Sequence, residues 1–255
     1  MTLIAVVLTD DGLLVAADSR QRFPQLGTFR DDAFKIRPVS APPRCVLSIA
    51  GLDVIWEVPN PTETHEPGWM PGASQVILDF GAIAGARLAT AQNGANLDLL
   101  RRVAGDCVRA MNEDPRVDRR QLAMLSGRPF ADLIFATAAR NGRSGRLGVV
   151  NLWVRTDAPQ IQTKEVRCKD LCEQGDPYFF GDLGYVEREL PEEYGHCRSA
   201  LSRSPLPTAD TAAAIKALVD AAGVRPGSPI GGPTDVVLIS SGGVRKLAWK
   251  RGEAG

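Results

Sequence analysis

Apolar residues form two short runs at the start of the chain, and a polar turn separates them. Residues 3–8 read Leu-Ile-Ala-Val-Val-Leu, and residues 13–17 read Leu-Leu-Val-Ala-Ala. Runs of this length, rich in β-branched and small apolar residues, are typical of buried strands. The dipeptide Asp11-Gly12 lies between them and favours a tight turn. The pattern therefore predicts a β-hairpin at the beginning of the sequence.

The register of this hairpin would bring the start of the chain beside a carboxylate. A two-residue loop pairs Thr9 with Gly12 and then places Thr2 opposite Ser19. Asp18 is the neighbour of Ser19 in the sequence. A loop one residue longer would shift this pairing by only one position, so Thr2 and Asp18 are expected to lie close together.

Further along the chain, predicted strands alternate with predicted helices. Apolar residues spaced three and four apart indicate helices over residues 75–92 and 96–112. A third helix is expected over 208–222, opened by Thr208 and Asp210 as N-cap residues. The other apolar runs predict strands, which lie at 34–36, 45–51, 131–138, 147–155, 160–166, 179–181, 235–240 and 244–249.

This order of elements predicts an α+β fold with largely antiparallel sheets. The sequence has no internal repeat and no linker, so we expect a single domain over residues 1–255. Four prolines fall between residues 57 and 75, which indicates a loop insertion there.

The composition of the chain argues against nucleic acids and membranes as its main partners. The chain has 255 residues, 44% hydrophobic and 24% charged, with 30 basic and 30 acidic residues. A zero net charge argues against nucleic acid as the main partner. No apolar run reaches the ~18 residues of a membrane span, and no basic segment precedes the first apolar run. We therefore expect no membrane partner and a cytoplasmic location, where the odd number of cysteines, five, would be free thiols.

Candidate chemistry gathers at the start of the chain. Removal of Met1 is common before a small residue and would give Thr2 a free α-amino group. Such an amine has a pKa of ~7.7–8.0 and can act as general base for the threonine hydroxyl. The hairpin supplies a carboxylate, Asp18, and the first lysine of the sequence, Lys35, supplies a cation. Gly51 ends the next predicted strand and could offer a backbone N–H to an oxyanion.

Both ends of the sequence resemble a known family. Residues 2–6 and 12–20, the latter ending Ala-Ala-Asp-Ser-Arg, are similar to the opening of proteasome β-type subunits, which are N-terminal nucleophile hydrolases. Residues 48–51 resemble the family strand that ends at the oxyanion glycine. Residues 231–235 and 28–30 resemble the bacterial ancestral β-subunit (Anbu) branch.

This resemblance implies a four-layer αββα sandwich of antiparallel sheets and a threonine-type peptidase. Thr2 would be nucleophile and base, Asp18 and Lys35 would tune its protonation, and Gly51 would hold the oxyanion. Arg20 would support Asp18. No metal or organic cofactor is implied.

The resemblance also implies partners. Identical copies would assemble into a large ring or spiral. The substrate would be a peptide or unfolded protein, docked by strand addition beside Arg22 and Asp53. An unfoldase partner would be compatible with this reading.

The sequence departs from the family pattern at several positions. Lys35 lies slightly later than the family lysine, and an alignment on residues 28–30 puts Asp31 in that place instead. Leu183, after Gly181-Asp182, stands where the family has a serine. The remaining correspondences are Asp182 and Asp220 as supporting acids, and Pro229, with Ser228 one residue early, at a second family serine.

These departures leave two further functions open. The chain could be a catalytically inactive scaffold of the same fold, or an amidase of the N-terminal nucleophile class that acts on a small molecule.

A zinc site is a weaker hypothesis than free thiols, because its adjacent His-Cys ligands would be unusual. Its ligands would be Cys168, Cys172, His196 and Cys197.

Overall fold

Strands of the computed structural model form two five-stranded sheets among the described residues, which are 2–23, 28–31, 33, 35–39, 45–51, 54–56, 76–89, 97–117, 129–139, 144–154, 161–171, 177–203 and 206–248. All strand pairs that the structure describes are antiparallel, as predicted. The first sheet has the order β12 (Tyr178–Gly181), β1 (Leu3–Thr9), β2 (Gly12–Asp18), β13 (Thr234–Ser240) and β14 (Gly243–Ala248).

The second sheet contains the middle of the chain. Its order is β11 (Ile161–Leu171), β10 (Gly145–Val154), β9 (Ala131–Ala138), β6 (Cys45–Gly51) and β5 (Ile36–Val39). Two small hairpins join β3 (Gln21–Phe23) to β4 (Thr28–Arg30) and β7 (Val54–Trp56) to β8 (Val76–Asp79). The helices are α1 (Phe80–Ala89), α2 (Leu97–Glu113), α4 (Leu183–Glu189), α5 (Pro191–Leu201) and α6 (Thr208–Gly223).

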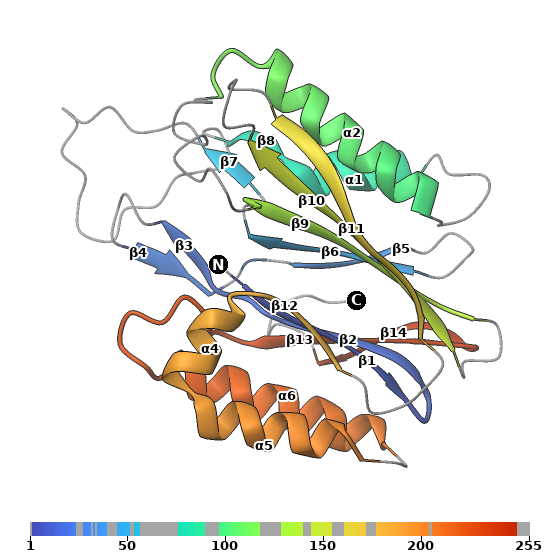
Figure 1. The fold of residues 1–255 in the computed structure, drawn as a ribbon, viewed down its shortest axis with the longest axis vertical. Helices are drawn as coiled ribbons and strands as arrows, with labels where there is room; N and C mark the ends of the chain where they lie inside the picture. Colours follow the sequence, from blue (N-terminus) through green and yellow to red (C-terminus); the bar gives the residue numbers. More distant parts are fainter. Residues whose placement is uncertain are drawn as a thin grey trace.

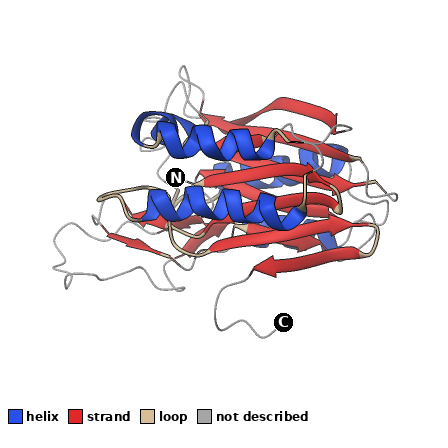
Figure 2. Cartoon of the chain, turned by 90° about the horizontal axis from the view of Figure 1, so that it is seen from below, coloured by secondary structure: helices blue, strands red, loops and turns tan. Residues whose placement is uncertain are grey.

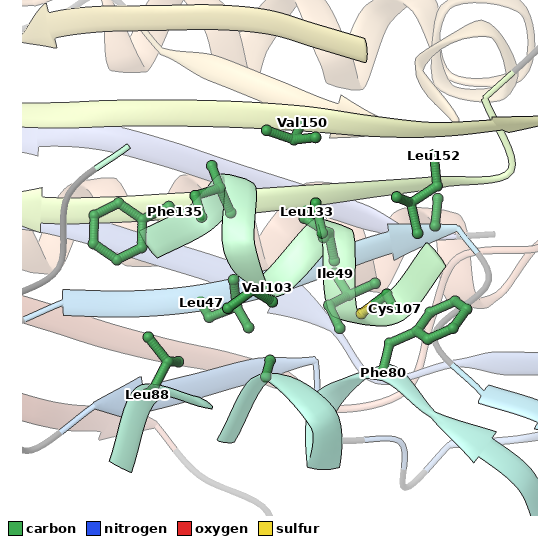
Figure 3. Packing of buried hydrophobic residues seen from close by; sticks show 14 of the residues in the cluster. Leu47, Ile49, Phe80, Leu88, Val103, Cys107, Leu133, Phe135, Val150 and Leu152 are labelled. Carbon is green, nitrogen blue, oxygen red and sulfur yellow. The ribbon is translucent and has the colours of Figure 1, made fainter. Parts of the chain in front are cut away.

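Helices cover the outer face of each sheet, and the inner faces pack against each other. Figure 1 shows α1 and α2 over the second sheet and α4, α5 and α6 over the first. Seen from below in Figure 2, two long helices lie side by side over the strands and run in nearly the same direction as they do. One hydrophobic cluster lies under α1 and α2 (Figure 3), a second fills the space between the sheets, and a third lies under the C-terminal helices.

The first hairpin has the predicted register, with Thr9 opposite Gly12. Every residue of β1 and β2 is buried. Ile4 and its alternate neighbours enter the cluster between the sheets, whereas Leu3 and its alternate neighbours pack under the helices. Because both faces of these strands are covered, their sequence is continuously apolar rather than alternating.

The structure explains three errors in the predicted elements. The expected helix over 75–92 begins at Phe80, because Val76–Asp79 pairs with β7 and the Asp79 carboxylate accepts the Ala82 N–H at 2.9 Å. The strand expected at 34–36 is instead Ile36–Val39, and its proline is tolerated because β5 is a sheet edge.

The third error concerns the cap of α6. Pro207 is its N-cap and makes no side-chain bond, while the Thr208 hydroxyl lies 2.8 Å from that of Thr9. The small hairpins and helices α4 and α5 were not predicted. The loop insertion expected at 57–75 lies outside the described residues.

Candidate functional site

Asp18 is the hub of the candidate site. It is the last residue of β2 and is fully buried. Its Oδ1 accepts the backbone N–H of Leu3 at 2.8 Å, and its Oδ2 accepts those of Arg20 and Gly231, each at 3.2 Å. Three backbone donors at a buried carboxylate replace the hydrogen bonds that it would make with water.

Lys35 supplies the cation that balances this carboxylate. Its Nζ lies 2.9 Å from Asp18 Oδ1 and 2.6 Å from the backbone oxygen of Arg20, and its side chain is 3% exposed. Asp18 Oδ1 therefore binds both the Lys35 ammonium and the peptide N–H that follows Thr2. The structure therefore places the peptide bond that follows Thr2, the Asp18 carboxylate and the Lys35 ammonium in one buried cluster.

The backbone of Thr2 is held from the other side as well. Thr2 is 1% exposed, and its carbonyl accepts the N–H of Asp182 at 2.9 Å. The Asp182 carboxylate caps α4 by accepting the Tyr185 N–H at 3.1 Å. Asp182 thus acts here through its backbone, and its side chain serves the helix.

Gly181 fits between β12 and the start of the chain. Its φ is +96°, and a Cβ at this position would lie 1.8 Å from the Thr2 carbonyl oxygen. Only glycine accommodates both the conformation and the contact. In the sequence, Gly181 is marked as the end of a predicted strand and as a neighbour of Leu183, but no local pattern shows that it contacts the Thr2 backbone.

Arg20 connects Asp18 to Asp31. Arg20 Nε and Nη2 donate to the two oxygens of Asp31 at 2.7 and 2.9 Å. Its Nη1 reaches the carbonyl oxygens of Ser228 at 3.4 Å and Ile230 at 3.5 Å. The hydrogen bond with Asp31 is the main reason that the pKa of Arg20 is raised. Asp31 therefore pairs with Arg20, and Lys35 is the partner of Asp18.

Gly51 is the residue expected at the oxyanion. It ends β6 with a φ of +90°, and a Cβ there would lie 2.4 Å from the Phe130 carbonyl oxygen. β6 ends on the side of the molecule where the chain begins (Figure 1). Position 51 therefore requires glycine, whatever its part in catalysis.

Asp220 is not brought to this cluster. Its side chain is 53% exposed on α6, where it pairs with Lys216 one helical turn earlier. The prediction that it supports the site was wrong, because this face of α6 points to solvent. Leu183 packs against the cluster under the helices, and the Ser228 hydroxyl binds the nearby Ile230 carbonyl at 2.8 Å.

Several other expected residues are only partly described. Arg22 lies in β3, but its side chain and Asp53 fall outside the described residues. The same holds for the side chains of Cys168 and Cys172, while His196 is exposed and Cys197 is buried. Among the described residues, no group of three or more His, Cys, Asp or Glu side chains could hold a metal ion. Burial raises the pKa of Cys45 and Cys107 to about 12, far from a reactive thiolate.

A second acid faces the inter-sheet layer near Gly51. Asp132 of β9 lies opposite Ala50, and its carboxylate accepts a hydrogen bond from the Asn151 amide of β10. Burial raises the pKa of Asp132 and outweighs that hydrogen bond. The folded chain therefore holds the Asp132 proton more tightly than the unfolded chain does, so ionisation at neutral pH opposes folding.

Asp132→Asn is accordingly expected to raise the free energy of unfolding at pH 7. The gain should shrink as pH falls and the wild-type carboxyl becomes protonated in both states. Denaturant titrations between pH 3 and 7 measure this, with the exposed Asp170→Asn as control. A pH-independent effect of D132N, or a loss of stability at pH 7, would contradict this interpretation.

Solved structures of other proteins identify the fold of this chain. No family model matches the chain, and no curated protein matches it either. A solved structure of an Anbu Gly-1 mutant from Hyphomicrobium sp. strain MC1 is 16% identical, with a TM-score of 0.55 over 99% of this chain and 89% of that one. Anbu (ancestral beta-subunit) from Yersinia bercovieri is 12% identical, with a TM-score of 0.52 over 96% of this chain and 87% of that one.

These likenesses extend over nearly the whole chain and agree with the resemblance seen at its two ends. Within the described residues, no helix combines the length and apolar character needed to cross a bilayer. The chain therefore has the fold of the Anbu, or ancestral β-subunit, proteins.

Proposed function

We propose that this chain is an Anbu-type, proteasome-like threonine peptidase subunit. The observation that carries the proposal is the buried Asp18–Lys35 pair at the peptide that follows Thr2. A fully buried ion pair at the start of a chain contributes little to stability by itself. Its place beside a residue that could become the N-terminal threonine supports a catalytic role.

The proposed reaction begins with loss of Met1, which lies outside the described residues. The freed Thr2 amine takes the proton of the Thr2 hydroxyl, whose oxygen attacks the substrate carbonyl. The tetrahedral intermediate then breaks its C–N bond, the leaving amine takes that proton from the Thr2 ammonium, and an acyl-enzyme remains. The Lys35 ammonium lowers the energy of the developing alkoxide, and Asp18 holds that ammonium in place. The Gly51 N–H would donate to the oxyanion. In the second step the Thr2 amine takes a proton from a water molecule that attacks the ester. The acid product is released, and the ammonium returns the proton to the Thr2 oxygen.

The resemblance extends the proposal beyond the chemistry. The two facing sheets between helices support a four-layer αββα sandwich of the N-terminal nucleophile type. We expect a single domain, a cytoplasmic location, no metal or organic cofactor, and assembly of identical copies into a ring or spiral. Peptides or unfolded proteins would be the substrates, and an unfoldase would be a compatible partner.

Turnover of fluorogenic peptides by untagged protein tests this proposal. Thr2→Ala should abolish turnover and leave the assembly size and melting temperature unchanged, because it removes a single hydroxyl and methyl group. Turnover by T2A would contradict the mechanism. A large assembly without turnover would favour the scaffold, and a monomer or dimer that hydrolyses only small amides would favour the amidase.

A further inference from the structure

Asp31 is the residue of this region that the reaction does not use. It follows β4, and its side chain is 33% exposed, whereas the Arg20 side chain that it binds is 8% exposed. The pair is bidentate, with both carboxylate oxygens occupied by Nε and Nη2 of Arg20. Planar, two-point pairs of this kind fix the orientation of an arginine.

The backbone of Arg20 holds both members of the buried pair. Its N–H donates to Asp18 Oδ2 at 3.2 Å, and its carbonyl accepts Lys35 Nζ at 2.6 Å. Displacement of this one residue would therefore move the carboxylate and the ammonium together. The Arg20 side chain restrains this backbone because its guanidinium is held on both sides. Asp31 binds Nε and Nη2, and the carbonyls of Ser228 and Ile230 bind Nη1.

Glycines enclose the same cluster. A Cβ at Gly231 would lie 2.7 Å from the Arg20 guanidinium carbon, and a Cβ at Gly232 would lie 2.8 Å from the Asp31 Cβ. The Ser19 hydroxyl also donates to the Asp31 backbone oxygen at 2.8 Å. Asp31 and Arg20 therefore pack closely against Gly231 and Gly232. The same loop donates the Gly231 N–H to Asp18.

We propose that Asp31 is a positioning residue that acts through Arg20 to hold Asp18 and Lys35 at Thr2. The expected effect on the reactivity of Thr2 rests on the proposed function. The expected effect on the position of Lys35 does not. Asp31 touches neither Thr2 nor Lys35 in any contact of the described residues. Its effect passes through the Arg20 side chain to the Arg20 backbone.

The charges around Arg20 determine how a loss of Asp31 would affect the pH profile. Asp18 and Tyr185 of α4 also act on the charge of this guanidinium, and Asp18 in turn binds the Lys35 ammonium. Without the Asp31 carboxylate, the Arg20 charge is less compensated and disfavours further positive charge nearby. The pKa of the Thr2 amine should fall, so the acid limb of the rate profile should move to lower pH.

Asp31→Asn tests the inference with two measurements. The first is the rate at which a peptide epoxyketone, which reacts with a hydroxyl and its adjacent free amine, modifies Thr2 as a function of pH. We expect at least a tenfold lower maximal rate and an acid limb at lower pH. Asp31→Glu should recover at least half of the loss, and Asp170→Asn, which removes the exposed ion pair with Arg146, should change nothing.

The second measurement does not depend on catalysis. Trace acetylation of the folded protein, quantified by mass spectrometry well below the melting temperature, reports how well Lys35 is held. We expect acetylation of Lys35 to rise at least threefold in D31N and acetylation of the exposed Lys216 to stay constant. Wild-type acetylation of Lys35 in D31N would overturn the inference, even if its melting temperature fell. A wild-type protein that forms no adduct would refute the proposed function instead, and the acetylation result would still decide the role of Asp31.

Discussion

Lys35→Ala is expected to lower peptide turnover by roughly 10²–10⁴-fold, the usual contribution of a group that moves or stabilises a proton in the reaction. The ammonium is buried against Asp18 and the Arg20 carbonyl, and its side chain is almost fully closed to solvent. Its removal leaves the Asp18 carboxylate with only backbone donors. We also expect a loss of stability of about 3–5 kcal/mol from breaking a buried pair.

The control must separate catalysis from folding. Lys216→Ala removes a lysine that is 58% exposed and pairs with the exposed Asp220. It should leave turnover unchanged and alter stability by less than about 0.5 kcal/mol. If K35A does not fold, the double variant Asp18→Asn/Lys35→Met replaces both charges with neutral side chains of similar size and should be folded and inactive. A folded K35A or double variant with wild-type turnover would remove Lys35 from the site.

Gly181→Ala is expected to destabilise the fold by roughly 2–4 kcal/mol and to abolish reaction at Thr2. The added Cβ would lie 1.8 Å from the Thr2 carbonyl oxygen, which is backbone and cannot swing aside. The strand must shift, and the Asp182 N–H that holds this carbonyl shifts with it. Thermal melting and the rate of epoxyketone modification measure the two effects.

Gly195→Ala is the matched control. This glycine lies in α5, and a Cβ there would have no atom within 4 Å. Alanine favours helix over glycine by up to about 1 kcal/mol, so this variant should be at least as stable as the wild type and equally reactive. Wild-type melting and reactivity in G181A would show that the start of the chain does not depend on this contact.

The sequence predicted best those strands in which every residue is buried. The runs at 3–8 and 13–17 are apolar because both faces of the first sheet are covered, and this signal is local. The helix expected over 75–92 begins later than predicted because Val76–Asp79 pairs with β7, and even the nearest paired residues, Trp56 and Val76, are 20 residues apart in the chain. Local spacing carries no information about such a pairing.

The candidate site was predictable only in part, for a related reason. Thr2, Asp18 and Arg20 share one hairpin, so register arguments reached them. Spacing did not decide between Asp31 and Lys35, because the length of an irregular segment does not fix which side chain enters the site. The N–H groups of Gly231 and Asp182 were not predicted as donors, because almost every residue has a backbone N–H and its residue type does not show which acceptor it meets.

The most direct test of the central claim is an intact mass spectrum of untagged protein after exposure to a peptide epoxyketone. We expect loss of Met1 and a single adduct on the wild type, and no adduct on Thr2→Ala. A protein that retains Met1, or an adduct that persists in T2A, would contradict the central claim.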